Sequence, residues 1–152
     1  MNKLSILDLD LAGKRVLMRV DFNVPIDEGR VGDDTRLRAS LPTIQHILDL
    51  GGHPVLMSHL GRPKGEAVPG LSLKPIAEAL QLLLGREVIM APDCIGPQTA
   101  SVVKSAPDGA VVLLENLRFH PEEEDNAPGF SMQLAELGDV YVNDAFGTAH
   151  RA

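Results

Sequence analysis

Short apolar segments, many of them β-branched, recur along the chain and are separated by longer segments with helical periodicity. The predicted strands are Arg15–Val20, Val55–Ser58, Glu87–Met90, Ala110–Leu114 and Val140–Val142. Continuous apolar runs of this length are typical of strands that are buried on both faces of a sheet. Strands that alternate with helices favour a parallel sheet covered by helices on both faces. We therefore predict a single α/β domain with a Rossmann-like, doubly wound parallel sheet.

Three segments between or after these strands have apolar residues at helical spacing, namely Thr35–Leu50, Leu73–Leu84 and Phe130–Leu137. Ser72 can cap the second helix, and Gly85 supplies its stop. Pro42 marks either a kink or a later start in the first helix. Two segments rich in glycine, proline and charge are predicted to be exposed loops, Arg62–Gly70 and Pro121–Gly129.

The length of 152 residues suits one domain with a substantial core. The single cysteine, Cys94, allows no internal disulfide, and we expect a packed or loop thiol in a reducing compartment. The amino-terminal segment has no signal-peptide core, and no apolar run approaches the roughly 18 residues of a membrane span. We therefore expect a soluble cytoplasmic protein that does not bind membranes.

The formal net charge of -7 argues against general attraction to nucleic acid. A small anionic ligand would therefore need a local basic pocket. Nine of the 14 basic residues are arginine, which suits fixed bidentate contacts with carboxylate or phosphate groups. The positions of the arginines therefore decide whether such a pocket can form.

Polar residues directly follow four of the predicted strands. They are Asp21 and Asn23 after the first, His59, Gly61 and Arg62 after the second, Glu115, Asn116, Arg118 and His120 after the fourth, and Asn143, Asp144, His150 and Arg151 after the last. Any one of them could serve solubility alone. In open parallel sheets, however, ligands bind beyond the carboxyl ends of the strands. Three arginines at one rim, Arg62, Arg118 and Arg151, therefore predict an anion site.

Arg36 is at or near the start of a predicted helix, where the helix dipole disfavours a positive charge. Either Arg36 and the helix start bind one negatively charged group together, or Arg36 is solvated and paired with Asp33 or Asp34. The position alone does not distinguish these two interpretations. The chain has no GxxxxGK[ST] loop, no GxGxxG after a strand, no HExxH and no EF-hand loop, and so shows no nucleotide or metal site of its own.

Several motifs in this sequence resemble the phosphoglycerate kinase family. They are RVDFNVP at 19–25, DDTRLRASLPTI at 33–44, SHLGRP at 58–63, LLENLRFH at 113–120 and NDAFGTAHRA at 143–152. The resemblance runs in order along the whole chain and concerns the amino-terminal, substrate-binding domain of that family. It implies that residues 1–152 form this domain without its carboxyl-terminal end. It also implies that the nucleotide-binding domain is absent from the chain.

The resemblance implies the glycolytic transfer of a phosphoryl group between 1,3-bisphosphoglycerate and ADP, which gives 3-phosphoglycerate and ATP. This is a phosphotransferase reaction with a carboxyl group as acceptor. Asp21 and Asn23 would bind the hydroxyl and carboxyl end of the glycerate, and Arg36 would be the catalytic residue beside the acyl phosphate. The non-reacting phosphate would be bound by a basic patch of His59, Arg62, Arg118 and Arg151.

The implied partners are 3-phosphoglycerate, 1,3-bisphosphoglycerate and the absent carboxyl-terminal domain, which would bind Mg-ATP or Mg-ADP. We expect the chain itself to bind no cofactor or metal, to be a monomer and to be inactive alone. The alternative is a non-catalytic interaction module that docks to a separate partner chain.

Overall fold

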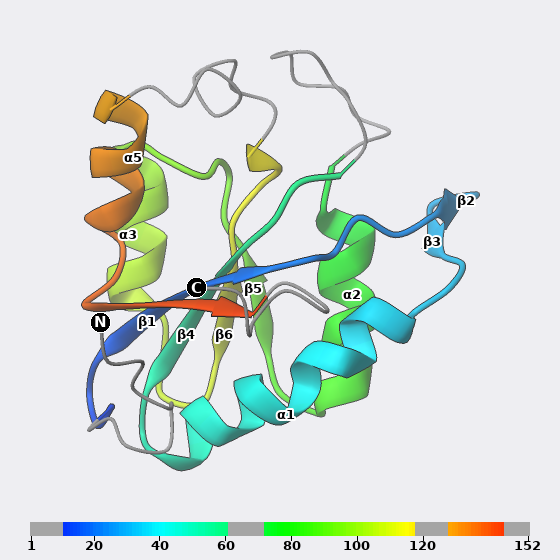
Figure 1. Cartoon of the computed structure of the whole chain (residues 1–152), viewed down its shortest axis with the longest axis horizontal. Helices are drawn as coiled ribbons and strands as arrows, with labels where there is room; N and C mark the ends of the chain where they lie inside the picture. The colour runs from blue at the N-terminus through cyan, green and yellow to red at the C-terminus, as the bar shows by residue number, and fades with distance from the viewer. Residues whose placement is uncertain (1–10, 61–71, 118–127, 145–152) are drawn as a thin grey trace.

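The computed structural model describes residues 11–60, 72–117 and 128–144. Its main sheet has five strands in the order β5-β6-β4-β1-β7, and every neighbouring pair is parallel (Figure 1). These strands are β1 (Arg15–Val20), β4 (His53–Met57), β5 (Val88–Met90), β6 (Val111–Leu113) and β7 (Val140–Asp144). The predicted α/β fold with a parallel sheet is confirmed.

The side on which the chain adds new strands to the sheet reverses at β1. Along the chain the strand after β1 in this sheet, β4, joins one side of it, whereas β7 joins its other side. In the register, Leu17 of β1 is opposite Val55 of β4 and Tyr141 of β7. Such a reversal is where open α/β sheets bind ligands, beyond the carboxyl ends of the strands. The carboxyl end of β1, at Val20, is therefore the first place to look for a site.

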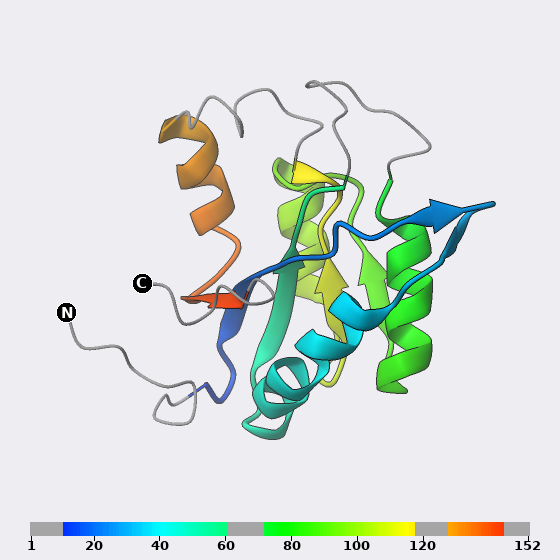
Figure 2. The ribbon, with the colours of Figure 1, turned by 45° about the vertical axis from the view of Figure 1, so that its right-hand side comes forward.

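Helices cover both faces of the sheet. The α1 (Thr35–Asp49) and α2 (Lys74–Leu84) helices pack on one face, and α3 (Pro97–Ser105) and α5 (Pro128–Ala135) lie on the other (Figure 2). Side chains alternate along β1, because successive residues of a strand point to opposite faces. Met18 accordingly belongs to the core under α1 and α2, and Leu17 belongs to the core under α3.

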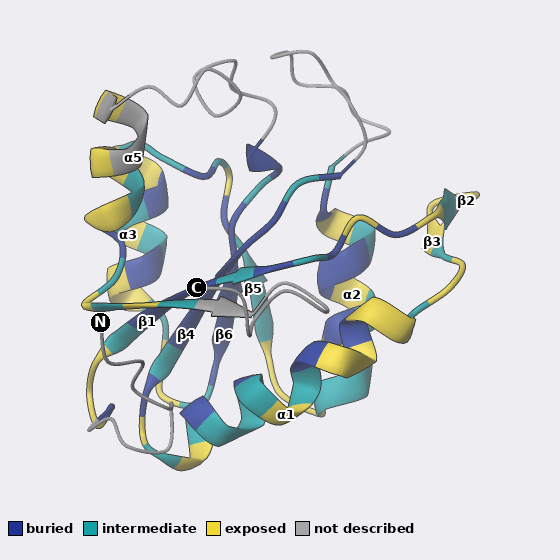
Figure 3. Cartoon of the chain, viewed as in Figure 1, coloured by how far each residue is buried: buried dark blue, intermediate teal, exposed yellow. Residues whose placement is uncertain are grey.

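The inner strands β1, β4 and β6 are largely buried between the two helical layers, whereas the edge strands β5 and β7 are more exposed (Figure 3). All three residues of β6 are buried, as the apolar sequence predicts for an interior strand. The α2 helix contributes Ile76 and Leu80, which are fully buried. Each such side chain stabilises the fold by about 1.5–3 kcal/mol relative to an exposed position. Gly85 ends α2 in the left-handed conformation that the sequence predicted.

The structure decides between the two interpretations of Pro42, and two helix starts differ from the predictions. The α1 helix begins at Thr35 and continues through the exposed Pro42, so Pro42 does not mark a later start. Leu73, and not Ser72, takes the N-cap position of α2, although the Ser72 hydroxyl accepts the Lys74 N–H at 3.2 Å. The α5 helix starts at Pro128, so the end of the predicted loop at 121–129 is helical. The rest of both predicted loops lies outside the described residues.

Two described elements have no counterpart in the sequence prediction. One is α3, and the other is a small antiparallel hairpin of β2 (Ile26–Asp27) and β3 (Arg30–Val31), which projects from the end of β1 (Figure 1). Glu28 and Gly29 connect its strands with φ angles of 52° and 75°. Two positive φ angles are those of a type I′ turn. None of the helices within the described ranges is both long and apolar enough to span a membrane.

Candidate functional site

Arg36 joins the start of α1 to the end of β1. Its Nη1 atom donates to Asp21 Oδ1 at 3.1 Å and to the Asn23 main-chain carbonyl at 2.7 Å. The Asn23 N–H also donates to Asp21 Oδ1, at 3.2 Å. Asp21 and Asn23 directly follow β1, and Arg36 is the second residue of α1. The structure therefore brings together three of the predicted site residues, which come from two separate motifs.

Neither of the two partners that the sequence suggested for Arg36 takes that role. Asp33 Oδ1 accepts the Thr35 hydroxyl at 2.6 Å and the Thr35 N–H at 3.0 Å, and these bonds lower the pKa of Asp33. Asp34 pairs with Arg38 at 3.0 Å, and this bond raises the pKa of the Arg38 guanidinium. The alternative of a pairing with Asp33 or Asp34, which the sequence left open, is thus wrong, because Arg36 pairs with Asp21 at the start of loop 21–25.

The Arg36–Asp21 pair is accessible from solvent. The Arg36 side chain is 43% exposed and the Asp21 side chain 27%. A guanidinium has five N–H donors, and Nη1 makes both bonds that join Arg36 to described residues. The start of a helix also has main-chain N–H groups without partners inside the helix and a partial positive charge. This arrangement can present donors to a small oxyanion.

Ser58 connects the end of β4 to the end of β1. This residue is fully buried, and its hydroxyl accepts the Phe22 N–H at 3.0 Å. His59, the next residue, is half-buried, and Phe22 lies between Asp21 and Asn23 in sequence. The segments that carry His59 and Asp21 are therefore neighbours, as expected for strand ends at one edge of a sheet. Sequence reasoning missed Ser58, although a serine at the end of an apolar run is an available signal.

The segment after β6 is hydrogen-bonded to the segment after β4. The Leu117 N–H donates to the Ser58 carbonyl at 3.1 Å, and the Asn116 side chain binds the main chain of Leu60. Glu115 and Asn116 were noticed in the sequence only as polar residues after a strand. In the structure they link β6 to neighbouring segments.

Other predicted residues cannot be assigned a place in this cluster. Arg62, Arg118 and Arg151, together with Gly61, His120 and His150, lie outside the described residues. The basic patch therefore stays a prediction. Asn143 and Asp144 belong to β7 itself and do not follow it. In the ranges 11–60, 72–117 and 128–144, no three histidine, cysteine or acidic side chains are grouped as a metal site would require.

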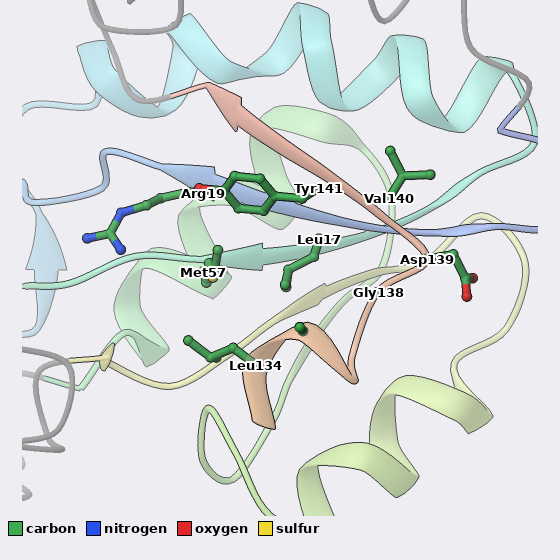
Figure 4. A pocket seen from close by; sticks show the side chains of 9 residues that line it. Leu17, Arg19, Met57, Leu134, Gly138, Asp139, Val140 and Tyr141 are labelled. Atoms are coloured by element: carbon green, nitrogen blue, oxygen red, sulfur yellow. The ribbon is translucent and has the colours of Figure 1, made fainter. Parts of the chain in front are cut away.

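A separate hollow lies on the other face of the sheet, between α5 and strands β1, β4 and β7 (Figure 4). Its volume is about 460 Å³. Leu17, Met57 and Leu134 line its middle, and Arg19 and Asp139 lie toward its two ends. The hollow contains none of the predicted site residues, so it is distinct from the Arg36 cluster.

The phosphoglycerate kinase family model matches residues 6–152. Among curated relatives, phosphoglycerate kinase of Moorella thermoacetica is 60% identical over 152 residues, and that of Chloroherpeton thalassium is 59% identical over 152 residues. Both alignments cover 100% of this chain, but they cover only 39% and 38% of the respective relatives. The chain thus spans less than half the length of these relatives.

Solved structures agree with the sequence comparison. Phosphoglycerate kinase from Coxiella burnetii aligns with 98% of this chain and 37% of its own, with a TM-score of 0.80 and 37% identity. The enzyme from Pyrococcus horikoshii aligns with 98% of this chain and 38% of its own, with a TM-score of 0.84 and 33% identity. Fold, motifs and sequence similarity therefore lead to one conclusion: this chain belongs to the phosphoglycerate kinase family.

Proposed function

We propose that this chain provides the 3-phosphoglycerate site of a phosphoglycerate kinase. The observation that carries the proposal is the hydrogen bonding of Arg36 to Asp21 and Asn23, where β1 ends and α1 begins. The reaction would be reversible phosphoryl transfer between 1,3-bisphosphoglycerate and ADP to give 3-phosphoglycerate and ATP. Family membership and the oxyanion-binding character of this cluster both support it.

In this proposal the residues at the end of β1 bind the glycerate. Asp21 accepts a hydroxyl hydrogen bond, and Asn23 binds near the carboxyl end. Arg36 remains fixed by Nη1 and directs its other donors to the acyl phosphate. His59, with Arg62, Arg118 and Arg151, binds the non-reacting phosphate.

The proposed chemistry needs no protein nucleophile. Phosphoryl transfer depends mainly on positioning and on stabilisation of the charge on the transferred group. A guanidinium at the start of a helix provides fixed positive charge and fixed donors for that group. The nucleotide, as its magnesium complex, would be bound by a part of the protein outside these 152 residues. The chain alone would then bind substrate without transferring phosphate.

Calorimetric titration with 3-phosphoglycerate tests the proposal. We expect a binding heat that weakens as salt is added, because the contacts are between opposite charges. The double variant Arg62→Ala, Arg118→Ala should abolish this heat. Arg38→Ala should not, because Arg38 pairs with Asp34 and has no place in the proposed site. Absence of binding, or binding that salt does not weaken, would contradict the proposal.

A second candidate function is docking to a separate chain without catalysis. The observation in its favour is Tyr141, which is 55% exposed beside the apolar hollow of Figure 4. Exposed aromatic side chains beside apolar surface are common in protein interfaces. Mixing the chain with the remaining part of a phosphoglycerate kinase tests this function. Formation of a complex that does not make ATP would favour docking alone, whereas ATP formation would favour the enzymatic proposal.

A further inference from the structure

Asn116 holds the main chain just after β4. Its Nδ2 donates to the Leu60 carbonyl at 2.8 Å, and its Oδ1 accepts the Leu60 N–H at 3.2 Å. Asn116 is fully buried, and Leu60 is buried as well. The buried main-chain N–H and C=O of Leu60 both need partners, and a side-chain amide is one of the few groups that can donate and accept together. Aspartate at this position would lack the donor, and an apolar residue would leave both Leu60 groups unpaired.

Glu115 precedes Asn116 in the segment after β6 and binds the start of α2. Its Oε2 accepts the Ser72 hydroxyl at 2.7 Å, and its Oε1 accepts the Leu73 N–H at 2.8 Å. Oε1 also accepts the Asn116 N–H at 2.8 Å. Leu73 occupies the N-cap position of α2 but has no side-chain oxygen for capping. Glu115 therefore supplies, from the segment after β6, the acidic group that a helix start favours.

These bonds continue to the Arg36 cluster. Leu117 donates to the carbonyl of Ser58, and the Ser58 hydroxyl accepts the N–H of Phe22, between Asp21 and Asn23. One connected set of hydrogen bonds thus links the start of α2 to the segments that follow β6, β4 and β1. The segments that follow β1, β4 and β6 each contain a residue of the proposed substrate site or adjoin one in sequence.

We propose that Glu115 and Asn116 are positioning residues for 3-phosphoglycerate binding. They contact no substrate in this proposal, and they act by fixing the main chain around His59 relative to Asp21. The inference rests on the proposed function, because that function supplies the ligand. A fully bonded, buried polar network is rigid, whereas loss of one member leaves unpaired groups that the chain must move to satisfy.

The test measures 3-phosphoglycerate affinity by calorimetry for the 152-residue chain and its variants. Asn116→Ala and Glu115→Ala should each weaken binding by about tenfold or more, because a small displacement of positioned groups is costly. Glu115→Gln keeps an oxygen acceptor and should lose less affinity than Glu115→Ala. If Asn116→Ala does not fold, the two variants of the half-buried Glu115 carry the test.

Val103→Ala is the matched control. Val103 is buried in α3 on the opposite face of the sheet, so this change lowers stability without touching the network. The Val103→Ala variant should bind 3-phosphoglycerate with the affinity of the unmodified chain. All affinities are measured at a temperature at which urea unfolding shows every variant to be folded. If the unmodified chain binds and the Glu115 and Asn116 variants bind equally well, this inference is overturned while the proposed function stands. If the unmodified chain does not bind, both are overturned.

Discussion

Arg36 Nη1 lies 3.1 Å from Asp21 Oδ1, so an ion pair joins the first turn of α1 to the residue that follows β1. Both side chains are partly exposed, and exposed pairs of this kind typically stabilise a protein by only about 0–1 kcal/mol. The pair therefore matters less for holding the fold together than for orienting the guanidinium.

Arg36→Ala should separate these two roles. We expect urea unfolding to show a loss of at most about 1 kcal/mol. With the remaining part of a phosphoglycerate kinase supplied, we expect kcat for ATP formation to fall by about 10²–10³, because a fixed donor to the transferred group is lost. Arg38→Ala, two residues along α1, provides the control and should leave kcat unchanged. An unchanged kcat in Arg36→Ala would exclude Arg36 from catalysis.

Gly138 lies where α5 leads into β7, and a larger residue there would require its neighbours to shift. A Cβ at this position would lie 2.6 Å from Leu17 Cβ and 3.1 Å from Leu17 N. Gly138→Ala should therefore lower the unfolding free energy by about 1–3 kcal/mol. Gly129→Ala, in the first turn of α5, meets nothing within 4 Å and should be neutral or stabilising by up to about 1 kcal/mol. Equal unfolding midpoints for the two variants would contradict this prediction.

Asp139 should contribute to acid unfolding. The Arg15 main-chain N–H donates to Asp139 Oδ2 at 2.9 Å, and chiefly this bond lowers the pKa of Asp139 below its ordinary value of 3.8. The folded state therefore favours the ionised carboxylate. This contribution is present above the unfolded-state pKa and is lost as the pH falls through the lower folded-state pKa.

Asp139→Asn should accordingly be less stable than the unmodified chain near pH 7, with a difference that shrinks below about pH 4. Urea unfolding measured at a series of pH values would show this convergence. The exposed Glu136, three residues earlier, offers Glu136→Gln as a control with little expected change. A stability difference for Asp139→Asn that stays constant with pH would rule out the role of its ionisation.

Cys94 should be unreactive in the folded chain. It is 0% exposed, and burial, followed by the negative charge of Asp93, raises the pKa of its thiol far above the usual range. The thiolate is the reactive form of cysteine, so the raised pKa slows alkylation of Cys94, and its burial keeps the reagent away. Labelling with a maleimide should follow the urea unfolding curve. Rapid labelling without urea would show that the core under α3 opens readily.

The strands of the main sheet could be predicted from their continuous apolar runs. The α1 and α2 helices could be predicted because their apolar residues keep helical spacing over several turns and because Gly85 marks the end of α2. The α3 helix could not, because it buries only Thr99 and Val103, and Gly96 before Pro97 is also typical of a turn. The β2–β3 hairpin has only two residues in each strand, and its turn places the non-glycine Glu28 at positive φ. These elements depend on tertiary context more than on local pattern.

The candidate site divides in the same way. Asp21, Asn23 and His59 could be singled out because each follows a predicted strand closely. The partner of Arg36 could not, because Asp33 and Asp34 are nearer in sequence, and only the path of loop 21–25 brings Asp21 to it. The roles of Ser58 and Asn116 depend on which strands are neighbours, and apolar periodicity contains no information about strand order.

The position of β1 between β4 and β7 has a consequence for how the chain acquires its structure. Synthesis produces β1 before any other described strand, yet Asp139, at the start of the β7 contact, is 124 residues beyond Arg15. Pairing across such a separation slows folding, because a long loop must close before its contacts form. On the ribosome β1 can pair with β4 well before β7 emerges, and until then its other edge is open to incorrect partners. Among the strands that the structure describes, the first to be synthesised is thus the last to have both of its neighbours.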